Sequence, residues 1–133
     1  MKRTILYCDG AARGNPGPAS YGYCLIEDSE TIFEEGKRIG ETTNNVAEYS
    51  GLLAGLKKAL ELGISDIEVR SDSQLLIRQL KGEYKVKAPG LIPLFEEAVV
   101  LKRKFKSVKL EHIPREENKR ADQLANFALD RVI

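Results

Sequence analysis

The stretch Asn45–Leu60, NVAEYSGLLAGLKKAL, marks the point where the hydrophobic pattern of this chain changes. Its apolar residues recur at the spacing of one helical face: Val46, Tyr49, Leu52, Leu53, Leu56, Ala59 and Leu60. Gly63 follows as a candidate left-handed stop. We therefore predict an amphipathic helix that begins near Asn45 and ends before Gly63.

The chain before this helix has the pattern of strands. Residues Thr4–Cys8, Tyr21–Ile26 and Thr31–Ile39 are rich in β-branched and aromatic side chains, and Gly/Pro-rich or acidic connections separate them. This pattern predicts a three-stranded antiparallel meander.

After the helix, strand and helix patterns alternate. The predicted elements are a strand over Ile64–Val69, a helix over Gln74–Leu80, an irregular basic link over Gly82–Gly90, a helix over Leu91–Lys104, a strand over Val108–Ile113 and a helix over Lys119–Val132. Parallel strands need right-handed crossovers, so the order βββ-α-β-α-α-β-α predicts an α/β fold. We expect a mixed five-stranded sheet, three antiparallel strands followed by two parallel ones, flanked by helices in one domain over residues 1–133.

Composition limits the classes of function. A chain of 133 residues with 42% hydrophobic content can form one domain with its own core. The formal net charge of +1 is too small for a protein that holds nucleic acid by bulk charge alone. Two cysteines without a C-x-x-C motif suit buried thiols in a reducing compartment, and no apolar run approaches membrane-spanning length. We expect a soluble, cytoplasmic protein.

Four carboxylates stand at element boundaries or early in helices: Asp9, Glu48, Asp72 and Asp122. Asp9 ends the first predicted strand, and Asp72 follows the fourth. If these two strands are neighbours, their acids face each other beyond the carboxyl ends of parallel strands, where open sheets bind ligands. Carboxylate oxygens suit Mg²⁺ or Mn²⁺, and two such ions about 4 Å apart serve in-line phosphoryl transfer.

Each acid also has a structural alternative. Glu48 closes a segment, Asn45–Glu48, that has the shape of a capping box. Asp72 could be the N-cap of the helix after it, and Asp122 could favour the dipole of its helix. Asp9 is harder to explain this way, since Ile5 and Tyr7 share its side of the strand.

Four segments together resemble the type 1 ribonuclease H family in order and spacing, over essentially the whole chain. They are Asp9–Gly10 with Gly14–Pro18, the Thr43–Asn44–Asn45–x–x–Glu48 segment, Asp72–Ser73–Gln74, and Asn118–x–x–Ala121–Asp122–x–Leu124–Ala125. The resemblance implies endonucleolytic hydrolysis of the RNA strand of RNA–DNA hybrids, with 5′-phosphate and 3′-hydroxyl products. It implies no covalent intermediate.

The resemblance also implies a two-metal mechanism with Mg²⁺, for which Mn²⁺ can substitute. Asp9 would bridge both ions, and Asp72 and Asp122 would complete one site each. Glu48 would support the ion on the leaving-group side and sense a ribose 2′-hydroxyl. One ion would lower the pKa of the attacking water, and the other would neutralise the departing oxygen.

Five further residues match substrate contacts of the family: Asn15, Thr43, Asn44, Asn45 and Gln74. The amide side chains would pair with 2′-hydroxyls and base edges in the minor groove, which is how RNA is told from DNA. Thr43 would contact a DNA phosphate. For Asn44 and Asn45, helix capping is the alternative.

The chain departs from the family pattern at three places. Many members carry a loop histidine before the last acid, whereas His112 here lies in a predicted strand and the loop shortens to Pro114–Glu117. Arg115 is the candidate to occupy that place, although a guanidinium cannot relay a proton at neutral pH. Ala11 replaces a common serine. The tryptophan-rich basic protrusion is missing, with Lys81–Lys87 as a reduced substitute, so we expect weaker and more salt-sensitive hybrid binding.

Two other functions compete with hybrid cleavage. The same fold could cut duplex RNA or a 3′ end, because function resides in the site. The chain could also be a catalytically silent nucleic-acid-binding module, although all four acids are present. We expect a monomer whose partner is an RNA–DNA hybrid and not a membrane.

Overall fold

The computed structural model describes residues 3–131. Its strands are β1 (Thr4–Ala12), β2 (Gly17–Glu27), β3 (Glu30–Thr42), β4 (Asp66–Ser71) and β5 (Ser107–His112). Its helices are α1 (Asn44–Glu61), α2 (Gln74–Leu80), α3 (Ile92–Lys102) and α4 (Lys119–Asp130), with a 3-10 turn η1 (Arg115–Glu117). The end predicted for the last helix, Val132, lies outside the described residues.

The five strands form one mixed sheet in the order β3-β2-β1-β4-β5. The pairs β1–β2 and β2–β3 are antiparallel, whereas β1–β4 and β4–β5 are parallel. The predicted fold class is therefore confirmed, and so is the expectation that the first and fourth strands are neighbours.

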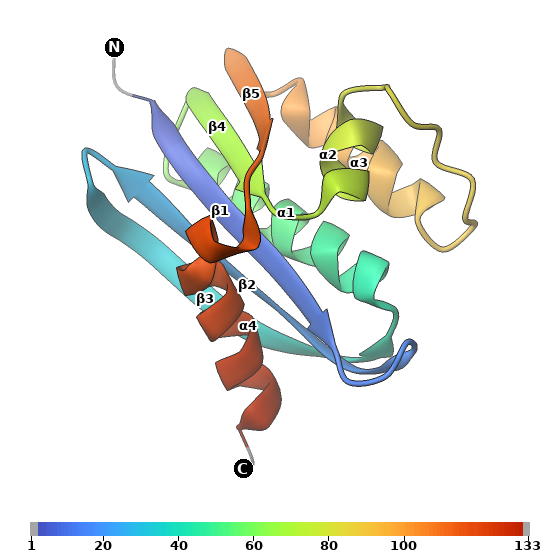
Figure 1. The fold of residues 1–133 in the computed structure, drawn as a ribbon. Coiled ribbons are helices and arrows are strands. Elements are labelled where there is room, and N and C mark those ends of the chain that lie inside the picture. The colour runs from blue at the N-terminus through green and yellow to red at the C-terminus, as the bar shows by residue number, and fades with distance from the viewer. Residues whose placement is uncertain (1–2, 132–133) are drawn as a thin grey trace.

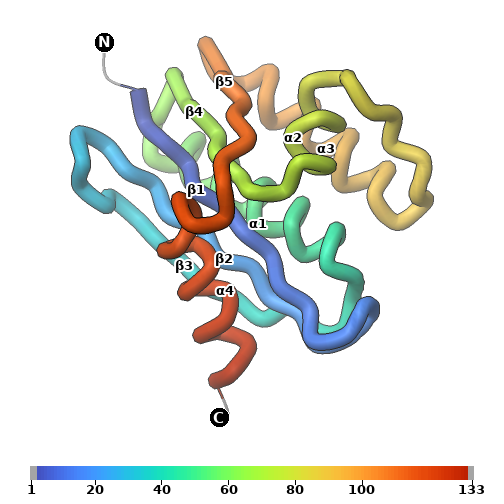
Figure 2. The backbone as a smooth tube through the Cα atoms, in the orientation of Figure 1, coloured from blue at the N-terminus to red at the C-terminus, as the bar shows by residue number. Residues whose placement is uncertain are grey.

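Helices cover both faces of this sheet. In Figure 1, α1 lies behind the sheet beside α2 and α3, and α4 crosses in front of the antiparallel strands. The link from β5 through η1 passes in front of β1 on its way to α4, as the chain trace in Figure 2 shows. This crossing brings the last segment of the chain over the middle of the first strand.

The core lies between the sheet and α1. Leu6 and Leu25 from the sheet and Tyr49 and Leu52 from α1 are at most 1% exposed. The Tyr49 hydroxyl donates to Gln79 Oε1 at 2.6 Å, which fixes α2 against α1. As predicted, α1 ends before Gly63, which adopts a φ of 80°. No helix within residues 3–131 is long and apolar enough to cross a membrane.

The first strand is longer than its sequence predicts. We expected it to end at Cys8, but β1 continues to Ala12 because its antiparallel pairing with β2 runs on through Asp9 opposite Gly22. The parallel pairing with β4 stops earlier, at Tyr7 opposite Arg70. Asp9 therefore lies within a strand, just past the point where β1 and β4 separate.

Candidate active site

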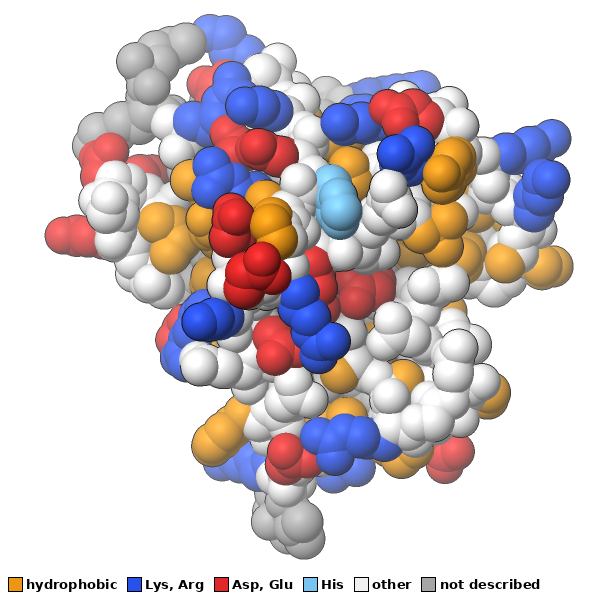
Figure 3. All heavy atoms as spheres, viewed as in Figure 1, with side chains coloured by type: hydrophobic (Ala, Val, Ile, Leu, Met, Phe, Trp, Pro, Cys, Tyr) orange, Lys and Arg blue, Asp and Glu red, His pale blue; other side chains and the backbone are white. Residues whose placement is uncertain are grey.

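The four predicted carboxylates lie together. Asp9, Glu48, Asp72 and Asp122 line one pocket of about 300 Å³, and Asn44 and Arg115 line it as well. The acids come from β1, α1, the turn after β4 and α4, so the pocket exists only in the folded chain. Acidic and basic side chains intermix on the face drawn in Figure 3, where α4 and η1 face the viewer.

A close approach of α1 to β1 brings Glu48 to Asp9. A Cβ added to Gly10 would overlap the Glu48 amide nitrogen and the Ala47 carbonyl, so only glycine permits this spacing. Both carboxylates are buried as a result, with Asp9 6% and Glu48 7% exposed.

Three of the structural alternatives are wrong. Thr43 is the N-cap of α1, and its hydroxyl accepts a hydrogen bond from the Val46 amide at 3.2 Å. Glu48 lies beyond the first turn and makes no capping box, and Asn44 and Asn45 are helical residues instead of caps. Ser73 caps α2 by accepting from the Leu76 amide at 3.2 Å, so Asp72 is not the N-cap.

Asp122 remains compatible with both interpretations. It lies in the first turn of α4, where a negative charge is favourable, and it also lines the pocket.

The groups around the pocket do not balance its negative charge. Burial, followed by the charge of Asp72, raises the pKa of Asp9 to about 7. Burial, followed by the charge of Asp9, raises the pKa of Glu48 above its ordinary value. Glu48 Oε2 is buried and has no hydrogen-bond partner among the described residues. A bound cation would stabilise a buried carboxylate oxygen that has no hydrogen-bond partner and lies beside other carboxylates.

The donor set suits a hard divalent cation. Every acid offers oxygen, the ligand atom that Mg²⁺ and Mn²⁺ prefer. Within residues 3–131, however, no three His, Cys, Asp or Glu side chains already stand in an arrangement that could hold an ion. The unpaired Glu48 oxygen and the carboxylate chemistry together fit a metal site.

The two thiols take no part in this chemistry. Cys8 and Cys24 are free and buried, as predicted. Burial raises the pKa of Cys24 to about 11 and that of Cys8 well above its ordinary value. Both stay protonated at neutral pH, so neither is a nucleophile.

Of the five candidate substrate residues, one lines the pocket and the other four lie outside its lining. Asn15, in the loop after β1, accepts the Asn44 amide hydrogen through its Oδ1 at 2.9 Å. Thr43, Asn44 and Asn45 follow one another at the start of α1, and only Asn44 among them lines the pocket. Gln74 is exposed at the first position of α2, two residues after Asp72.

The positions of the histidine and of the loop arginine agree with expectation. His112 is the last residue of β5, and its Nε2 lies 3.3 Å from the Asp72 carbonyl oxygen. Arg115 begins η1 and lines the pocket. The sequence therefore located both residues, although the chemical role of Arg115 stays a prediction.

Sequence reasoning assigned no role to Asn118, which the structure places beside Asp72. Its Nδ2 donates to the Cys8 carbonyl at 2.9 Å and to Asp72 Oδ1 at 2.7 Å, and the residue is 1% exposed. One amide thus connects β1, the end of β4 and the start of α4. Both bonds join residues far apart in the chain, so the sequence showed only that Asn118 opens the family-like segment Asn118–Ala125, four residues before Asp122.

A larger hollow on the molecule is unrelated to this chemistry. It measures about 510 Å³, and Leu124, Phe127 and Ala128 of α4 line it together with basic residues of β3. No carboxylate lines it, so we assign the chemistry to the smaller acidic pocket.

Comparison with known proteins shows the family and the fold. The family model described as "Reverse transcriptase-like" matches residues 7–128. The chain is 46% identical over 129 residues to Ribonuclease HI of Halobacterium salinarum and covers 65% of that protein. It is 45% identical over 130 residues to Bifunctional protein Rv2228c of Mycobacterium tuberculosis, of which it spans 36%. In both cases 96% of this chain is aligned.

Solved structures are similar over nearly the whole chain. The crystal structure of RNase H1 from Halobacterium salinarum superposes with a TM-score of 0.94 at 46% identity, covering 96% of this chain and 98% of that one. LC11-RNase H1, solved in complex with an RNA/DNA hybrid, gives 0.91 at 44% identity and covers 96% and 97%.

Proposed function

This chain belongs to the ribonuclease H family, and from that premise we propose that it cuts the RNA strand of RNA–DNA hybrids internally. The products would be 5′-phosphate and 3′-hydroxyl ends. A similar protein, LC11-RNase H1, has been solved in complex with an RNA/DNA hybrid, which supports this choice of substrate. The observation that carries the proposal is the gathering of four carboxylates, with a raised pKa at Asp9, in one pocket.

Asp9, Glu48, Asp72 and Asp122 would hold two Mg²⁺ ions, for which Mn²⁺ can substitute. When bound, the ions would supply an activated water nucleophile and charge neutralisation at the departing 3′-oxygen. The other three acids, Asp72, Asp122 and Glu48, all shift the pKa of Asp9, so its carboxyl lies close to each of them. A carboxylate so placed is suited to serve both ions.

The amide groups of the candidate substrate residues would recognise the hybrid. The Oδ1 of Asn15 is occupied by the Asn44 backbone, whereas its Nδ2 has no partner among the residues that the structure describes. That Nδ2 and the exposed side chains of Asn44, Asn45 and Gln74 can bond to 2′-hydroxyls and base edges.

Two further residues would contact phosphate. Thr43 uses an oxygen lone pair to cap α1, and this leaves its hydroxyl hydrogen to donate to a phosphate of the DNA strand. Arg115 offers a guanidinium at the pocket, which can stabilise phosphate charge during cleavage without moving a proton.

The test is cleavage of an end-labelled RNA–DNA hybrid in Mg²⁺ and then in Mn²⁺, with Asp72→Asn as the control. Duplex RNA, duplex DNA and single-stranded RNA run alongside. Internal cuts confined to the RNA of the hybrid, and lost in Asp72→Asn, are the expected result. Cleavage of duplex RNA to the same extent would contradict the proposed amide discrimination. Hybrid binding without cleavage in either ion would favour the silent module.

A further inference from the structure

An asparagine on α4 holds the carboxylate of Asp122. The Nδ2 of Asn126 donates to Asp122 Oδ1 at 3.1 Å and to the Asp122 carbonyl at 2.9 Å. Asn126 follows Asp122 by four residues, so both side chains lie on the same helical face. Asn126 also lines the acidic pocket.

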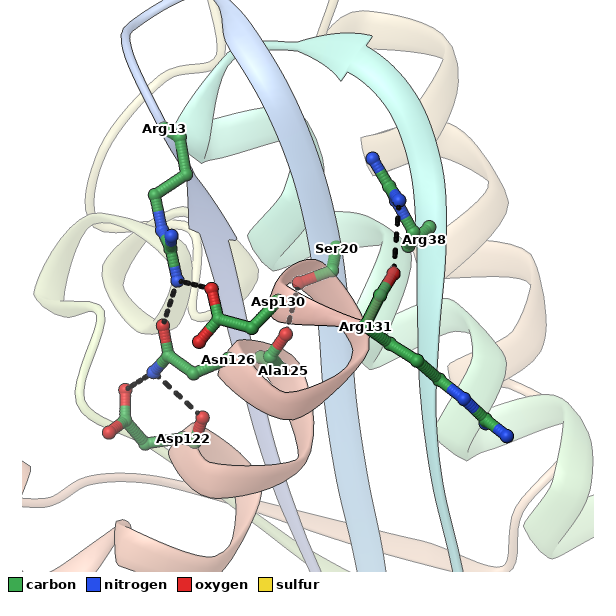
Figure 4. Close-up of polar contacts among 8 residues, drawn as sticks. All are labelled: Arg13, Ser20, Arg38, Asp122, Ala125, Asn126, Asp130 and Arg131. Carbon is green, nitrogen blue, oxygen red and sulfur yellow. Dashed lines mark hydrogen bonds and ion pairs between the residues drawn. The ribbon is translucent and has the colours of Figure 1, made fainter. Parts of the chain in front are cut away.

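An arginine on the opposite side of the pocket fixes the orientation of that amide. Arg13, from the loop between β1 and β2, places Nη2 3.5 Å from Asn126 Oδ1 and 2.6 Å from Asp130 Oδ1. Figure 4 shows Arg13 reaching across to α4, with Asn126 between its guanidinium and Asp122. Because a guanidinium only donates, the amide must turn its oxygen to Arg13 and its nitrogen to Asp122.

We propose that Asn126 is a positioning residue for Asp122 and that Arg13 acts through Asn126 by setting the direction of its amide. The proposal rests on the function proposed above, in which Asp122 holds a metal ion. Asn126 commits Oδ1 of the carboxylate to a hydrogen bond and leaves Oδ2 for the ion. A fixed carboxylate binds a cation better than one free to rotate, because less rotamer entropy is lost on binding.

Attachment of α4 to the sheet does not explain these contacts, because other contacts provide it. Ser20 donates its hydroxyl hydrogen to the Ala125 carbonyl, and Arg38 donates to the Arg131 carbonyl at 3.4 Å. Figure 4 shows Ser20 and Arg38 on the side of α4 away from Asp122. Arg38 is therefore a matched control: an arginine that bonds to the same helix but not to the carboxylate.

The experiment measures Mg²⁺ binding to the metal-free protein by calorimetry, without substrate. Five proteins are compared: wild type, Asn126→Ala, Arg13→Ala, the Asn126→Ala/Arg13→Ala double variant and Arg38→Ala. Loss of a group that orients a metal ligand typically weakens affinity by about 10–100-fold, which we expect for Asn126→Ala. Arg13→Ala should have a smaller effect, and Arg38→Ala should bind as wild type does.

The double variant separates an indirect role of Arg13 from a direct one. If Arg13 acts through Asn126, the double variant binds Mg²⁺ no more weakly than Asn126→Ala alone. Hybrid cleavage by Asn126→Ala should then recover as the Mg²⁺ concentration rises. Circular dichroism of each variant checks the fold.

Two results would overturn the proposal. Unchanged Mg²⁺ affinity in Asn126→Ala would remove the positioning role, and additive losses in the double variant would show that Arg13 acts independently. A wild-type protein that neither binds Mg²⁺ nor cleaves the hybrid would instead refute the proposed function, so the two failures are distinguishable.

Discussion

The inner and outer halves of the acidic pocket are built in different ways. Asp9 and Glu48 form the inner half, where close packing of α1 on β1 buries both carboxyls and leaves Glu48 Oε2 without a partner among the described residues. Asp72 and Asp122 form the outer half. Each accepts a hydrogen bond from an asparagine amide of the α4 segment, Asn118 for Asp72 and Asn126 for Asp122.

The difference separates two requirements of a cation site. The inner half supplies buried carboxyls: burial, followed by the charge of Asp72 in the outer half, raises the pKa of Asp9 to about 7, so the ionised, metal-free carboxylate is unfavourable. The outer half supplies direction, because amide donors hold a carboxylate in one rotamer without adding positive charge that would compete with the ion. Variants can test each half separately.

Replacing an inner acid should have the largest effect. We expect Asp9→Asn to lower hybrid cleavage by at least about 10²-fold, because it removes a charge that stabilises the reaction. The same variant should be more stable than wild type without metal, by roughly 1 kcal/mol, since an uncompensated buried charge is gone. Cleavage assays and denaturant unfolding in chelator measure the two effects.

Asp66→Asn is the matched control for that variant. A hydrogen bond from Ser107 holds the pKa of Asp66 below its ordinary value, so its negative charge is favourable in the folded protein. We expect unchanged cleavage and slightly lower stability. If Asp9→Asn were also less stable than wild type, the inner half would not be electrostatically strained.

Widening the inner half should have the second-largest effect. Gly10→Ala places a Cβ against the backbone of α1, and such overpacking typically costs about 1–3 kcal/mol of unfolding free energy. Cleavage should fall with it, because Glu48 moves away from Asp9. Gly90→Ala, whose Cβ would meet no atom within 4 Å, serves as the control. Equal stability of both variants would contradict the close approach.

In the outer half, loss of Asn118 should weaken both the fold and the site. Asn118→Ala leaves the buried Cys8 carbonyl without its side-chain donor, at a cost of about 1–3 kcal/mol, and frees the Asp72 carboxylate. We expect weaker Mg²⁺ binding together with a lower unfolding free energy. Asn118→Asp, which keeps the shape but loses the donor, should bind Mg²⁺ no better than wild type. Tighter binding in this variant would contradict a positioning role for the amide.

The smallest expected effect concerns the basic link between α2 and α3. Lys85 and Lys87 are exposed there, and each phosphate contact should contribute about one unit to the slope of log affinity against log salt. The double variant Lys85→Ala/Lys87→Ala should therefore bind the hybrid with a shallower slope. The control is Lys37→Ala on β3. Wild-type affinity that stays flat between low and physiological salt would refute a phosphate-binding link.

Local sequence patterns predicted most helices and strands, because these elements depend on short-range spacing of residues. The helix over Gln74–Leu80 and the stop at Gly63 were correct for this reason. The end of β1 was not, since an Asp-Gly pair resembles a strand terminator, and the pairing of Asp9 with Gly22 that extends the strand is a long-range contact. Likewise, the N-cap of α1 is Thr43, two residues before Asn45, and this excluded the capping box at Glu48.

In the candidate site, too, local sequence features were predictable and long-range contacts were not. Four carboxylates in order were visible in the sequence, and the fold brings them to one pocket. The amides that hold them were not, because Asn118 reaches residues 110 and 46 positions away and Arg13 reaches Asn126 across 113. Spacing identifies the charged groups, whereas only the folded chain identifies the groups that orient them.

The pH dependence of stability follows from the inner half. The pKa of Asp9 rises from an ordinary 3.8 to about 7, so the folded state binds a proton more tightly than the unfolded state does. Its contribution therefore favours folding below about pH 4 and is lost as the pH rises to about 7. Metal-free wild type should lose this contribution over that range, and Asp9→Asn should not.

Thermal unfolding at pH 8 during a Mg²⁺ titration tests most directly whether the inner carboxylates require a cation, because both carboxyls of the inner half are most strongly driven to ionise at that pH. The melting temperature of wild type should rise with Mg²⁺, since an ion bound only by the folded state stabilises it. Asp9→Asn should start higher and respond little. A wild-type melting temperature that stays constant through millimolar Mg²⁺ would show instead that the inner carboxylates need no cation.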